Sequence, residues 1–542
     1  MKILLIVPKY NLVTGRTYDY IFPLGLDYIL TVIKKAGYEV DYLNLNHTDG
    51  APKVIISSVL DSKHYDMVGT GNNSLGYCMT EMILDAVKDH ISKPKTILGG
   101  PIITTEPELI FDTLKPDFGV IGEGEETILE LLASIKKDAD LALVDGIIFR
   151  NNKNEIIQTQ KRTPIADLDS IPFPDVEGLG FEQQLENLHC NFSPYTTLFD
   201  KPRIYPLLAS RSCPFQCTFC YHDGKYRKRS IRNVMDELDL VVKKYKINFI
   251  LLYDDCFSFD RNRIVEFCNQ IKKLQSEISW ELRWVCQLMV TVTDAELLKT
   301  LKDAGCVAIS YGFESFSPIV LRSMRKNITP EQIDSAFNKT LDAKMAVLAN
   351  FIFGDVAETR ETANATLDYW KKNCKGQVVL SFVQPYPGSE IYRHCLRKGI
   401  IKDKLDFIKN LSPRSEFNMT DTMSDQEMNA LRHEISHLEA TYSKKVRPIN
   451  MRKTAGDTNS FVVRCPYCEK RIEYGNVDIL IFSEFKSWFY GIPVLCRNCY
   501  MKFKITSMLY KIYGDHIPKL QLLAKVYLKF VRKLGEIRIK QQ

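Results

Sequence analysis

The 542-residue sequence lacks a long apolar run, a low-complexity segment and an internal repeat. Its apolar stretches are shorter than the roughly 18 residues that a membrane-spanning helix needs, which argues against such a span. The first residues, MKILLIVPKYN, contain a short β-branched run but no small-residue cleavage site of the kind that ends a signal peptide. We therefore expect a β-strand at the start of the chain and a cytoplasmic location.

The regular cysteine framework of a small disulfide-bonded domain is also missing. Fifteen cysteines are spread over the chain, and seven of them form one CxxxCxxC group and two CxxC pairs. In a chain with 45% hydrophobic and 25% charged residues, this spacing favours metal ligation in a reducing compartment. The length predicts two to four domains.

Most of the chain has no excess of positive charge. The formal net charge is +6, but residues 501–542 hold ten of the 72 Lys and Arg residues and two of the 66 Asp and Glu residues. The remainder is therefore close to neutral. Nucleic-acid-binding proteins usually present a larger basic face, so the composition argues against nucleic acid as a partner.

Residues 1–144 alternate short apolar runs with helical patterns. Strands are predicted at 3–7, 40–45, 65–70, 96–98 and 118–121. Leu26, Ile29, Leu30 and Ile33 recur at helical spacing and form one apolar stripe, and Gly37 is suited to end that helix. Such alternation is typical of a parallel sheet, and it predicts a Rossmann-like or flavodoxin-like α/β domain.

Residues 204–400 repeat the same alternation. Strands are predicted at 204–210, 249–253, 281–286, 307–312, 346–353 and 378–384. Six strand–helix units predict a (β/α)6 partial TIM barrel, although a full barrel is also compatible with the pattern. Thr293 and Glu296 have the spacing of a capping box at the start of one helix.

The remaining segments differ from these two α/β domains in composition. The segment 145–203 contains five prolines and is predicted as a connector. We predict a helical extension at 401–460, a small domain at 461–510 and a tail at 511–542.

The sequence SRSCPFQCTFCYHDG follows the first predicted barrel strand, and we call these residues, 210–224, the cluster loop. Parallel barrels carry their chemistry at the carboxyl ends of their strands, where this loop begins. Cys213, Cys217 and Cys220 are spaced to bind three irons of a 4Fe-4S cluster and leave the fourth iron open. A zinc site with a distant fourth ligand, or three unrelated buried cysteines, is the alternative.

This CxxxCxFC arrangement resembles the signature of the radical S-adenosylmethionine (SAM) superfamily. The resemblance implies that the open iron binds the amino and carboxylate groups of SAM. It also implies that an electron from the cluster cleaves SAM to methionine and a 5′-deoxyadenosyl radical. Phe219 corresponds to an aromatic residue near the adenine, and simple packing is its alternative role.

Two further strand ends occupy positions at which this family contacts SAM. Asp254 and Asp255 end the second barrel strand, where the family meets the SAM amino group; a helix N-cap is the alternative. Glu314 ends the fourth strand, at the ribose-contacting position. Its alternative role is an ordinary salt bridge with Arg322 or Arg325.

The fifth and sixth strand ends match the family less closely. In NFIFGDVAE, Ile352 and Gly354 match a segment that lies near the adenine, whereas Asn350 replaces its first glycine. The sequence QPYPGS at 384–389 resembles a rim turn of radical SAM enzymes that carry an N-terminal cobalamin domain. A turn before a helix would explain that sequence equally well.

The N-terminal domain resembles the cobalamin-binding domain of such enzymes. The resemblance implies a serine–leucine element and a glycine pair near the nucleotide tail of cobalamin, followed by a GEGE sequence. The residues concerned are Ser74, Leu75, Gly99, Gly100, Gly122 and Glu123. The Asp-x-His-x-x-Gly motif is missing, so a bound cobalamin would lack that histidine ligand. A domain that has lost the cofactor is the alternative.

Cys465 and Cys468, and Cys496 and Cys499, form two CxxC pairs separated by 27 residues. This spacing predicts a closed, tetrahedral, structural zinc site in a domain of the zinc-ribbon kind. A second 4Fe-4S cluster for electron relay is the alternative.

Residues 517–540 have the pattern of a basic amphipathic helix. Such a helix can dock on the body of the protein or lie on an anionic membrane surface. The expected partners are a small-molecule or lipid-like substrate and an electron donor such as flavodoxin or ferredoxin, with peripheral membrane contact as a further option.

Together these patterns lead to the hypothesis of a cobalamin-dependent radical SAM methyltransferase that acts at an unactivated carbon. In this scheme the radical abstracts hydrogen, and methylcobalamin, recharged by a second SAM, delivers the methyl group. One alternative keeps the radical chemistry without methyl transfer, as an oxidative cyclase, rearrangement enzyme or oxidoreductase. A non-catalytic zinc-ribbon or RNA-binding scaffold is the other.

Overall fold

The computed structural model describes residues 1–10, 18–190, 193–412, 417–454, 458–478 and 491–506. The predicted tail at 511–542 lies outside these residues. Unit 1 comprises Met1–Asn187, Leu208–Leu240 and Gln384–Met419, and unit 2 comprises Leu188–Leu207, Val241–Val383 and Thr420–Gln542. No helix in the described part of the chain combines the length and the hydropathy that crossing a membrane requires.

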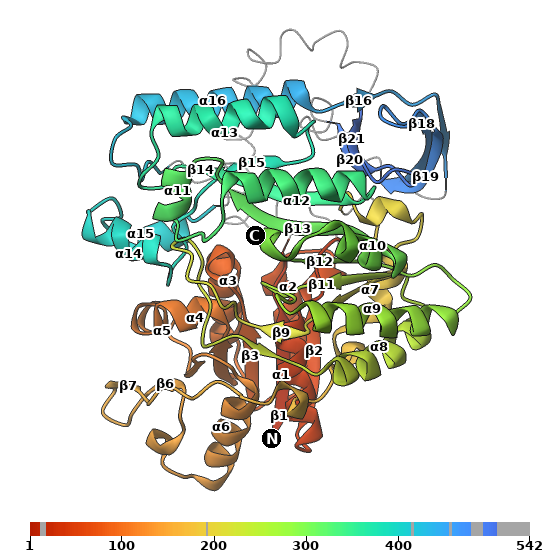
Figure 1. Ribbon diagram of the computed structural model, residues 1–542. Helices are drawn as coiled ribbons and strands as arrows, with labels where there is room; N and C mark the ends of the chain where they lie inside the picture. The colour runs from red at the N-terminus through yellow and green to blue at the C-terminus, as the bar shows by residue number, and fades with distance from the viewer. Residues whose placement is uncertain (11–17, 191–192, 413–416, 455–457, 479–490, 507–542) are drawn as a thin grey trace. The chain divides into compact units, whose positions relative to one another are not determined.

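The core of unit 1 is a seven-stranded sheet in the order β2-β1-β3-β4-β5-β6-β7 (Figure 1). Its strands are β1 (Lys2–Val7), β2 (Glu39–Asn44), β3 (Met67–Gly71), β4 (Lys95–Gly99), β5 (Phe118–Val120), β6 (Ile147–Arg150) and β7 (Ile156–Gln158). The first five strands are parallel, and the strand order reverses between β1 and β3 as in flavodoxin-like folds. This arrangement confirms the predicted α/β fold.

Helices cover both faces of this sheet, which explains why the central strands β1 and β3 are buried along nearly their whole length. They are α1 (Leu24–Lys35), α2 (Pro52–Ser62), α3 (Tyr77–Asp89), α4 (Pro101–Thr105), α5 (Pro107–Leu114) and α6 (Glu125–Lys137). Leu4 and Ile6 of β1 pack with Ile56 of α2 and Ile83 of α3. Gly37 ends α1 with a φ of 84°, a left-handed conformation that glycine adopts without strain.

The antiparallel strands β6 and β7 come from the segment predicted as a connector. The turn between them is closed by Asn151, whose side chain accepts hydrogen bonds from the backbone of Lys153 and Glu155. Both strands are only three or four residues long, so their sequence carries no clear alternation. The rest of unit 1 includes α7 (Phe181–Asn187), β9 (Ser210–Arg211), β10 (Arg227–Lys228), α14 (Glu390–Arg397) and α15 (Lys404–Lys409). Helix α8 (Ile231–Tyr245) begins in unit 1 and ends in unit 2.

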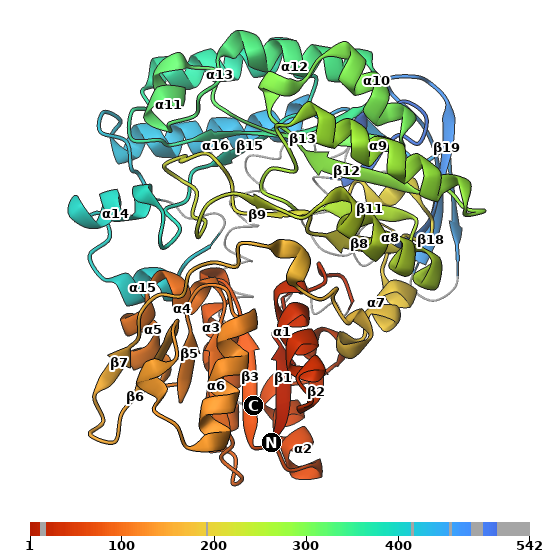
Figure 2. The same cartoon turned by 60° about the horizontal axis from the view of Figure 1, so that its bottom comes forward.

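Unit 2 contains a six-stranded parallel sheet in the order β15-β14-β13-β12-β11-β8 (Figure 2). Its strands are β8 (Ile204–Leu207), β11 (Phe249–Leu252), β12 (Arg283–Gln287), β13 (Cys306–Glu314), β14 (Ala346–Phe353) and β15 (Val379–Phe382). Among the described strands β8 and β15 are not paired with each other, so the sheet is a partial barrel.

The outer face of this sheet packs against the connecting helices. They are α9 (Arg261–Ser276), α10 (Ala295–Asp303), α11 (Pro318–Ser323), α12 (Pro330–Asp342) and α13 (Arg360–Asn373). Trp284 of β12 meets Phe267 of α9 edge to face at 5.0 Å, and Phe313 of β13 meets Phe337 of α12 in the same way. Burying these large rings is a main source of the stability of the unit.

The prediction that Thr293 caps α10 is wrong by one residue. Asp294 is the N-cap and accepts a hydrogen bond of 2.8 Å from the backbone of Leu297. Thr293 instead donates its hydroxyl hydrogen to the carbonyl of Met289. A carboxylate is a better acceptor than a hydroxyl at a helix N-terminus, which favours the aspartate.

The last described part of unit 2 contains a helix and two small sheets. Helix α16 (Asp425–Tyr442) is followed by β16 (Lys445–Val446), β17 (Asn450–Lys453), β18 (Thr458–Arg464), β19 (Arg471–Asp478), β20 (Ile492–Leu495) and β21 (Lys502–Ile505). The sheets have the orders β16-β21-β20 and β17-β18-β19. The strands β16 and β17 therefore lie in the segment that was predicted to be a helical extension.

Candidate active site

The cluster loop in unit 1 is closed at its base by the antiparallel pair β9 and β10. Arg211 and Arg227 are register partners in this pair, and two like charges in such positions repel each other. The carboxylate of Glu123 lies 3.2 Å from Arg211 and 2.9 Å from Arg227, so it neutralises this repulsion. Burial would raise the pKa of Glu123, but the hydrogen bond from Arg227 and the charge of Arg211 outweigh it and lower the pKa. Glu123 thus fixes the two ends of the cluster loop.

The interior of the cluster loop is held by His222, which the sequence analysis did not single out. Its Nε2 donates to the carbonyl of Phe215 at 2.8 Å, and its Nδ1 lies 3.0 Å from the hydroxyl of Ser212. The backbone of Ile391 in α14 donates to the carbonyl of Thr218 at 2.9 Å. These contacts shape the segment that carries the three cysteines.

The predicted rim turn at 384–389 packs on the cluster loop. Gly388 has a φ of 87°, and a Cβ atom there would lie 2.6 Å from the ring of Tyr221. Ser389 caps α14 by accepting a hydrogen bond from the backbone of Tyr392. The segment is therefore a turn before a helix, and its glycine is needed for close packing against Tyr221.

Cys213 and Cys217 are half-buried and Cys220 is exposed, so the alternative of three buried cysteines is wrong. Phe219 is half-buried beside them in the chain. Among the described residues, these three cysteines do not form a group of ligands gathered within 4.8 Å, as binding of one metal ion would require. Three accessible thiols in one loop fit a cluster in which each of three irons takes its own cysteine.

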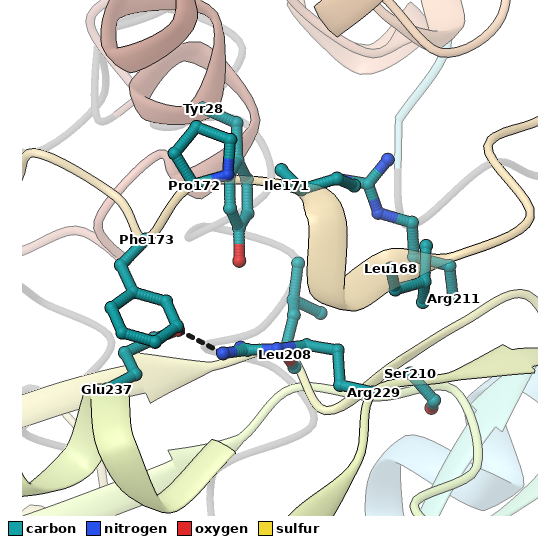
Figure 3. Close-up of a pocket in the computed structure, with 10 residues that line it drawn as sticks. All are labelled: Tyr28, Leu168, Ile171, Pro172, Phe173, Leu208, Ser210, Arg211, Arg229 and Glu237. Atoms are coloured by element: carbon teal, nitrogen blue, oxygen red, sulfur yellow. Dashed lines mark hydrogen bonds and ion pairs between the residues drawn. The ribbon is translucent and has the colours of Figure 1, made fainter. Parts of the chain in front are cut away.

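Behind the cluster loop, the buried Arg229 supports the segment that leads into it (Figure 3). Its guanidinium forms an ion pair of 2.7 Å with the buried Glu237, donates to the carbonyl of Leu208 and covers the ring of Phe173. The cavity in Figure 3 has a volume of about 10 Å³, space for about one water molecule. It is too small for a substrate, so we regard this region as structural support.

The N-terminal residues predicted to bind cobalamin follow the carboxyl ends of β3, β4 and β5. Gly99 has open space around the position of a Cβ atom, whereas a Cβ atom on Gly100 would lie 2.7 Å from the backbone oxygen of Asn72. Ser74 is buried, and the side chain of Leu75 is 39% exposed. An open glycine and an exposed leucine at this edge fit a large, partly apolar ligand such as cobalamin.

Gly122 and Glu123, also predicted to bind cobalamin, contact the protein itself. A Cβ atom on Gly122 would lie 3.3 Å from the carboxylate of Asp223 in the cluster loop. The backbone of Ile165 and the side chain of Arg227 both donate to Oε2 of Glu123. In this structure the two residues therefore join the edge of the N-terminal sheet to the cluster loop.

The predicted SAM-contacting residues of the barrel lie in unit 2. Asp254 is buried and Asp255 is exposed, directly after β11. The N-cap of α9 is Asp260, which accepts hydrogen bonds from the backbone of Asn262 and Arg263. The N-cap alternative for Asp254 and Asp255 is therefore wrong.

Glu314 forms an ion pair of 3.0 Å with Lys326, and not with Arg322 or Arg325 as the alternative proposed. A Cβ atom on Gly312 would lie 2.3 Å from the Glu314 carboxylate and 2.4 Å from the Lys326 ammonium group. Glycine at position 312 thus leaves the space that the ion pair occupies. Lys326 has no motif in the sequence that would have identified it.

Gly354 begins a tight turn after β14. It has a φ of 93°, and its backbone donates a hydrogen bond of 2.6 Å to the carboxyl group of Glu358. Burial raises the pKa of Glu358 to about 8, and the hydrogen bond from Gly354 opposes this shift. On β14, Ile352 and Asn350 are more exposed than the buried Phe351 and lie on the opposite face of the strand.

Helix α16 covers the edge strand β15, a role that the sequence analysis missed. Glu439 accepts a hydrogen bond of 3.0 Å from the backbone of Leu380, which satisfies a donor at the open edge. The guanidinium of Arg432 lies 4.6 Å from the ring centre of Phe382. The residues of α16 that make these contacts are separated by seven positions and therefore share one face of the helix.

Cys465, Cys468, Cys496 and Cys499 form a second candidate metal centre in unit 2. Their sulfur atoms all lie within 4.8 Å of one another, with separations of 3.8 Å for Cys465–Cys499 and 3.6 Å for Cys468–Cys496. A tetrahedron with Zn–S bonds of about 2.3 Å places its sulfur atoms about 3.8 Å apart. The four thiols therefore fit one zinc ion and do not fit a second 4Fe-4S cluster.

The chain has an α/β domain followed by a partial barrel, and one loop carries three accessible cysteines. This combination defines the class of enzymes in which a Rossmann-like domain precedes a partial barrel used for radical chemistry. Comparison with known proteins supports this class directly. The radical SAM superfamily model matches residues 207–369, and the B12 binding domain model matches residues 10–132. The chain thus contains a radical SAM domain and an N-terminal B12-binding domain. Its predicted cofactor set of a 4Fe-4S cluster, SAM and cobalamin is confirmed by these matches.

Curated relatives cover most of the chain. An uncharacterized methyltransferase, PH0819, from Pyrococcus horikoshii is 26% identical over 74% of this chain and 84% of its own length. An anaerobic magnesium-protoporphyrin IX monomethyl ester cyclase from Rubrivivax gelatinosus is also 26% identical, over 72% of this chain and 70% of its own length. The cytidylyl-2-hydroxyethylphosphonate methyltransferase of Streptomyces wedmorensis is 25% identical, over 74% of this chain and 82% of its own length.

Two solved structures share the fold. The radical SAM methyltransferase TsrM from Kitasatospora setae, with cobalamin and a 4Fe-4S cluster bound, superposes with a TM-score of 0.59 at 17% identity. The match covers 74% of this chain and 76% of that chain. The cobalamin-dependent enzyme OxsB superposes with a TM-score of 0.57 at 18% identity, over 99% of this chain and 72% of that chain.

Proposed function

We propose that the protein is a cobalamin-dependent radical SAM methyltransferase that acts on an unactivated carbon of a small molecule. The observation that carries this proposal is the contact of Glu123 with Arg211 and Arg227. It joins the cluster loop to the edge of the B12-binding domain within one structural unit. An enzyme that uses both cofactors on one substrate needs these two elements in a fixed arrangement.

In this proposal Cys213, Cys217 and Cys220 hold the cluster. When bound, the cluster and SAM supply the radical that abstracts hydrogen from the substrate, and cobalamin supplies the methyl group. His222 and Glu123 keep the cluster loop in one conformation through the contacts described above. Such preorganisation lowers the entropy cost of assembling the site.

The residues proposed to contact SAM lie in the cluster loop and at or just after the ends of barrel strands. They are Phe219 in the cluster loop and Asp254, Asp255, Glu314, Ile352 and Gly354 in unit 2. Lys326 neutralises Glu314 through one carboxylate oxygen, Oε1, so Oε2 can still accept a hydrogen bond from a hydroxyl group. The turn at Gly354 is held open by its hydrogen bond to Glu358.

The proposed cobalamin contacts are Ser74, Leu75 and Gly99 at the sheet edge. The chain offers no lower histidine ligand in the missing Asp-x-His-x-x-Gly motif, so these residues would hold the corrin and its tail by packing and backbone approach. Within unit 1 they follow parallel strands that end at the same edge as Gly122 and Glu123. That shared edge supports placing cobalamin next to the cluster loop.

We propose a small-molecule substrate and a protein electron donor such as flavodoxin or ferredoxin as partners. The electron donor would reduce the cluster before it cleaves SAM. A lipid-like substrate and peripheral membrane contact through residues 517–540 stay predictions, since that segment lies outside the described residues. A radical SAM cyclase is the second candidate, because three curated relatives of 23% to 26% identity are named as cyclases.

The test is an anaerobic incubation of the reconstituted protein with SAM, dithionite and hydroxocobalamin, followed by mass spectrometry. Wild type should form 5′-deoxyadenosine, and Cys217→Ala should form none. Cys78→Ala is the matched control, because this exposed cysteine lies outside both cysteine groups. S-adenosylhomocysteine formed together with 5′-deoxyadenosine supports methyl transfer, whereas 5′-deoxyadenosine alone favours the cyclase. Equal activity of wild type and Cys217→Ala would refute the assignment of the loop.

A further inference from the structure

The four-cysteine centre of unit 2 is continuous with the bottom of the barrel. We call residues 465–468 the first knuckle and residues 496–499 the second knuckle. Leu495 and Tyr500 flank the second knuckle directly in the chain. The barrel floor is the buried cluster at the amino ends and lower halves of its strands, formed by Phe249, Val285, Val307, Ala308 and Ala346.

Leu495 is a member of the barrel floor and is only 1% exposed. Tyr500 packs against the same cluster from the other end of the second knuckle. In parallel barrels this amino-terminal face serves stability, while chemistry takes place at the opposite end. Leu495 and Tyr500, which adjoin the metal ligands, therefore fill the amino-terminal end of the barrel.

The backbone of Leu495 is fixed on both sides. Its N–H group donates to the hydroxyl of Thr197 at 3.0 Å, and its carbonyl accepts from the hydroxyl of Tyr474 at 2.7 Å. Arg497, inside the second knuckle, donates to the carbonyl of Thr197 and forms an ion pair of 2.7 Å with Asp200. Thr197 and Asp200 belong to the segment that leads directly into β8, the first barrel strand.

The first knuckle contacts the barrel at a second point. The hydroxyl of Tyr467 donates to the carbonyl of Lys375, in the loop between α13 and β15, at 2.9 Å. The buried Gln377 donates from its side chain to Tyr467 and to the carbonyl of Lys502 at 3.0 Å each, and it accepts from the backbone of Lys502 at 2.8 Å. The metal centre is thus joined to loops that precede β8 and β15, the two edge strands of the partial barrel.

We infer that these cysteines bind one zinc ion and that this ion holds the barrel floor closed. A partial barrel has no hydrogen bonds between its edge strands to fix its lower end. The knuckles supply this restraint, because each is fixed by the metal and each contacts a segment next to an edge strand. The site is an integral part of the barrel and not a separate module. This inference does not depend on which reaction the enzyme catalyses.

The first measurement is the metal content of the purified full-length protein. Wild type should contain one zinc ion per chain in addition to its iron, and Cys468→Ser should lose the zinc. Cys78→Ser, the same change at an exposed cysteine elsewhere, should retain it. Additional iron in place of zinc, dependent on Cys468, would overturn the proposed metal.

The second measurement is hydrogen–deuterium exchange of the wild-type protein before and after removal of zinc by a chelator. We expect exchange to increase about tenfold or more in peptides that contain Phe249, Val307 and Ala346, as well as in residues 458–506. Iron content is measured in parallel so that loss of the cluster is recognised. An increase confined to residues 458–506 would show that the metal stabilises only its own small domain and would overturn the inference.

Two variants test the effect of Leu495 on the barrel floor while all four cysteine ligands stay in place. Leu495→Ala should keep its zinc and still increase exchange at the barrel floor, because a buried side chain that plugs the floor is removed. Ile472→Ala is the matched control, since Ile472 is buried in the core of the small domain and is not part of the barrel floor. If the two variants increase exchange at the barrel floor equally, Leu495 has no special role there.

Discussion

Glu123 and Arg227 are joined by a hydrogen bond and an ion pair, each of 2.9 Å, although the two residues are 104 positions apart in the chain. The same carboxylate faces Arg211, the register partner of Arg227. One side chain of the B12-binding domain therefore holds both ends of the loop that carries the cluster cysteines. This contact makes the geometry of the cluster loop depend on the neighbouring domain.

Glu123→Gln should loosen the cluster loop. The amide keeps the shape of the side chain but leaves the largely buried Arg227 without a negative partner, while Arg211 keeps its ion pair with Glu125. We expect a cost on the order of 3 kcal/mol. We expect a lower unfolding temperature and less iron retained after anaerobic gel filtration. Glu126→Gln is the control, because Glu126 is exposed and pairs with Arg162 only at 3.5 Å. Iron retention equal to wild type in Glu123→Gln would contradict this role.

Alanine at Gly100 should lower the stability of the fold, whereas alanine at Gly99 should lower cobalamin affinity. Gly100→Ala combines a positive φ with a clash against the backbone of Asn72 and should destabilise the protein by on the order of 2 kcal/mol. Gly99→Ala enters open space and should leave the unfolding temperature within experimental error while lowering cobalamin affinity about fivefold. Thermal unfolding and the absorbance of bound cobalamin measure the two effects. Wild-type cobalamin affinity in Gly99→Ala would remove Gly99 from the cofactor site.

The ion pair of Glu314 with Lys326 should influence SAM binding. Lys326→Met removes the charge and should weaken SAM binding about tenfold, whereas Lys326→Arg should retain most of it. Gly312→Ala should resemble Lys326→Met, because its Cβ atom would occupy the space of the ion pair. Equilibrium dialysis with labelled SAM measures the affinity. If Lys326→Met binds SAM as wild type does, the ion pair is only structural.

Glu358 should make the protein less stable as the pH rises. Its pKa is raised to about 8 by burial, so between about pH 4.5 and pH 8 the folded state binds more protons than the unfolded state. The contribution of Glu358 to the stability of the fold is therefore greatest below pH 4.5, and this contribution is lost progressively as the pH rises to about 8. Glu358→Gln should flatten this dependence and raise the unfolding temperature at pH 8. Asp368→Asn, at an exposed carboxylate of α13, should keep the wild-type dependence; the same slope in Glu358→Gln would contradict the assignment.

Much of the fold could be predicted because its signals are local. The strands of both parallel sheets were located to within a few residues, since each is a short apolar run between helical patterns. The short hairpin of β6 and β7 was not predicted, because strands of three or four residues are too short to show a clear alternation of apolar and polar residues. The start of α10 was misplaced by one residue because threonine and aspartate adjoin there and both can cap a helix.

The sequence by itself determined the features that depend on short spacing along the chain. These are the alternation of strands and helices, the three cysteines of the cluster loop, and the two CxxC pairs whose sulfur atoms meet in the fold. A cofactor loop can be identified in this way because its ligands are neighbours in the chain, and their chemistry follows from spacing alone.

Only the tertiary structure decided which distant residues complete these local elements. Glu123 reaches the base of the cluster loop, Lys326 pairs with Glu314, and Leu495 enters the barrel floor. None of these residues differs in type from its many counterparts elsewhere in the chain. Their roles arise because the fold desolvates them next to a specific partner, and the identity of that partner is a property of the topology and not of the local sequence.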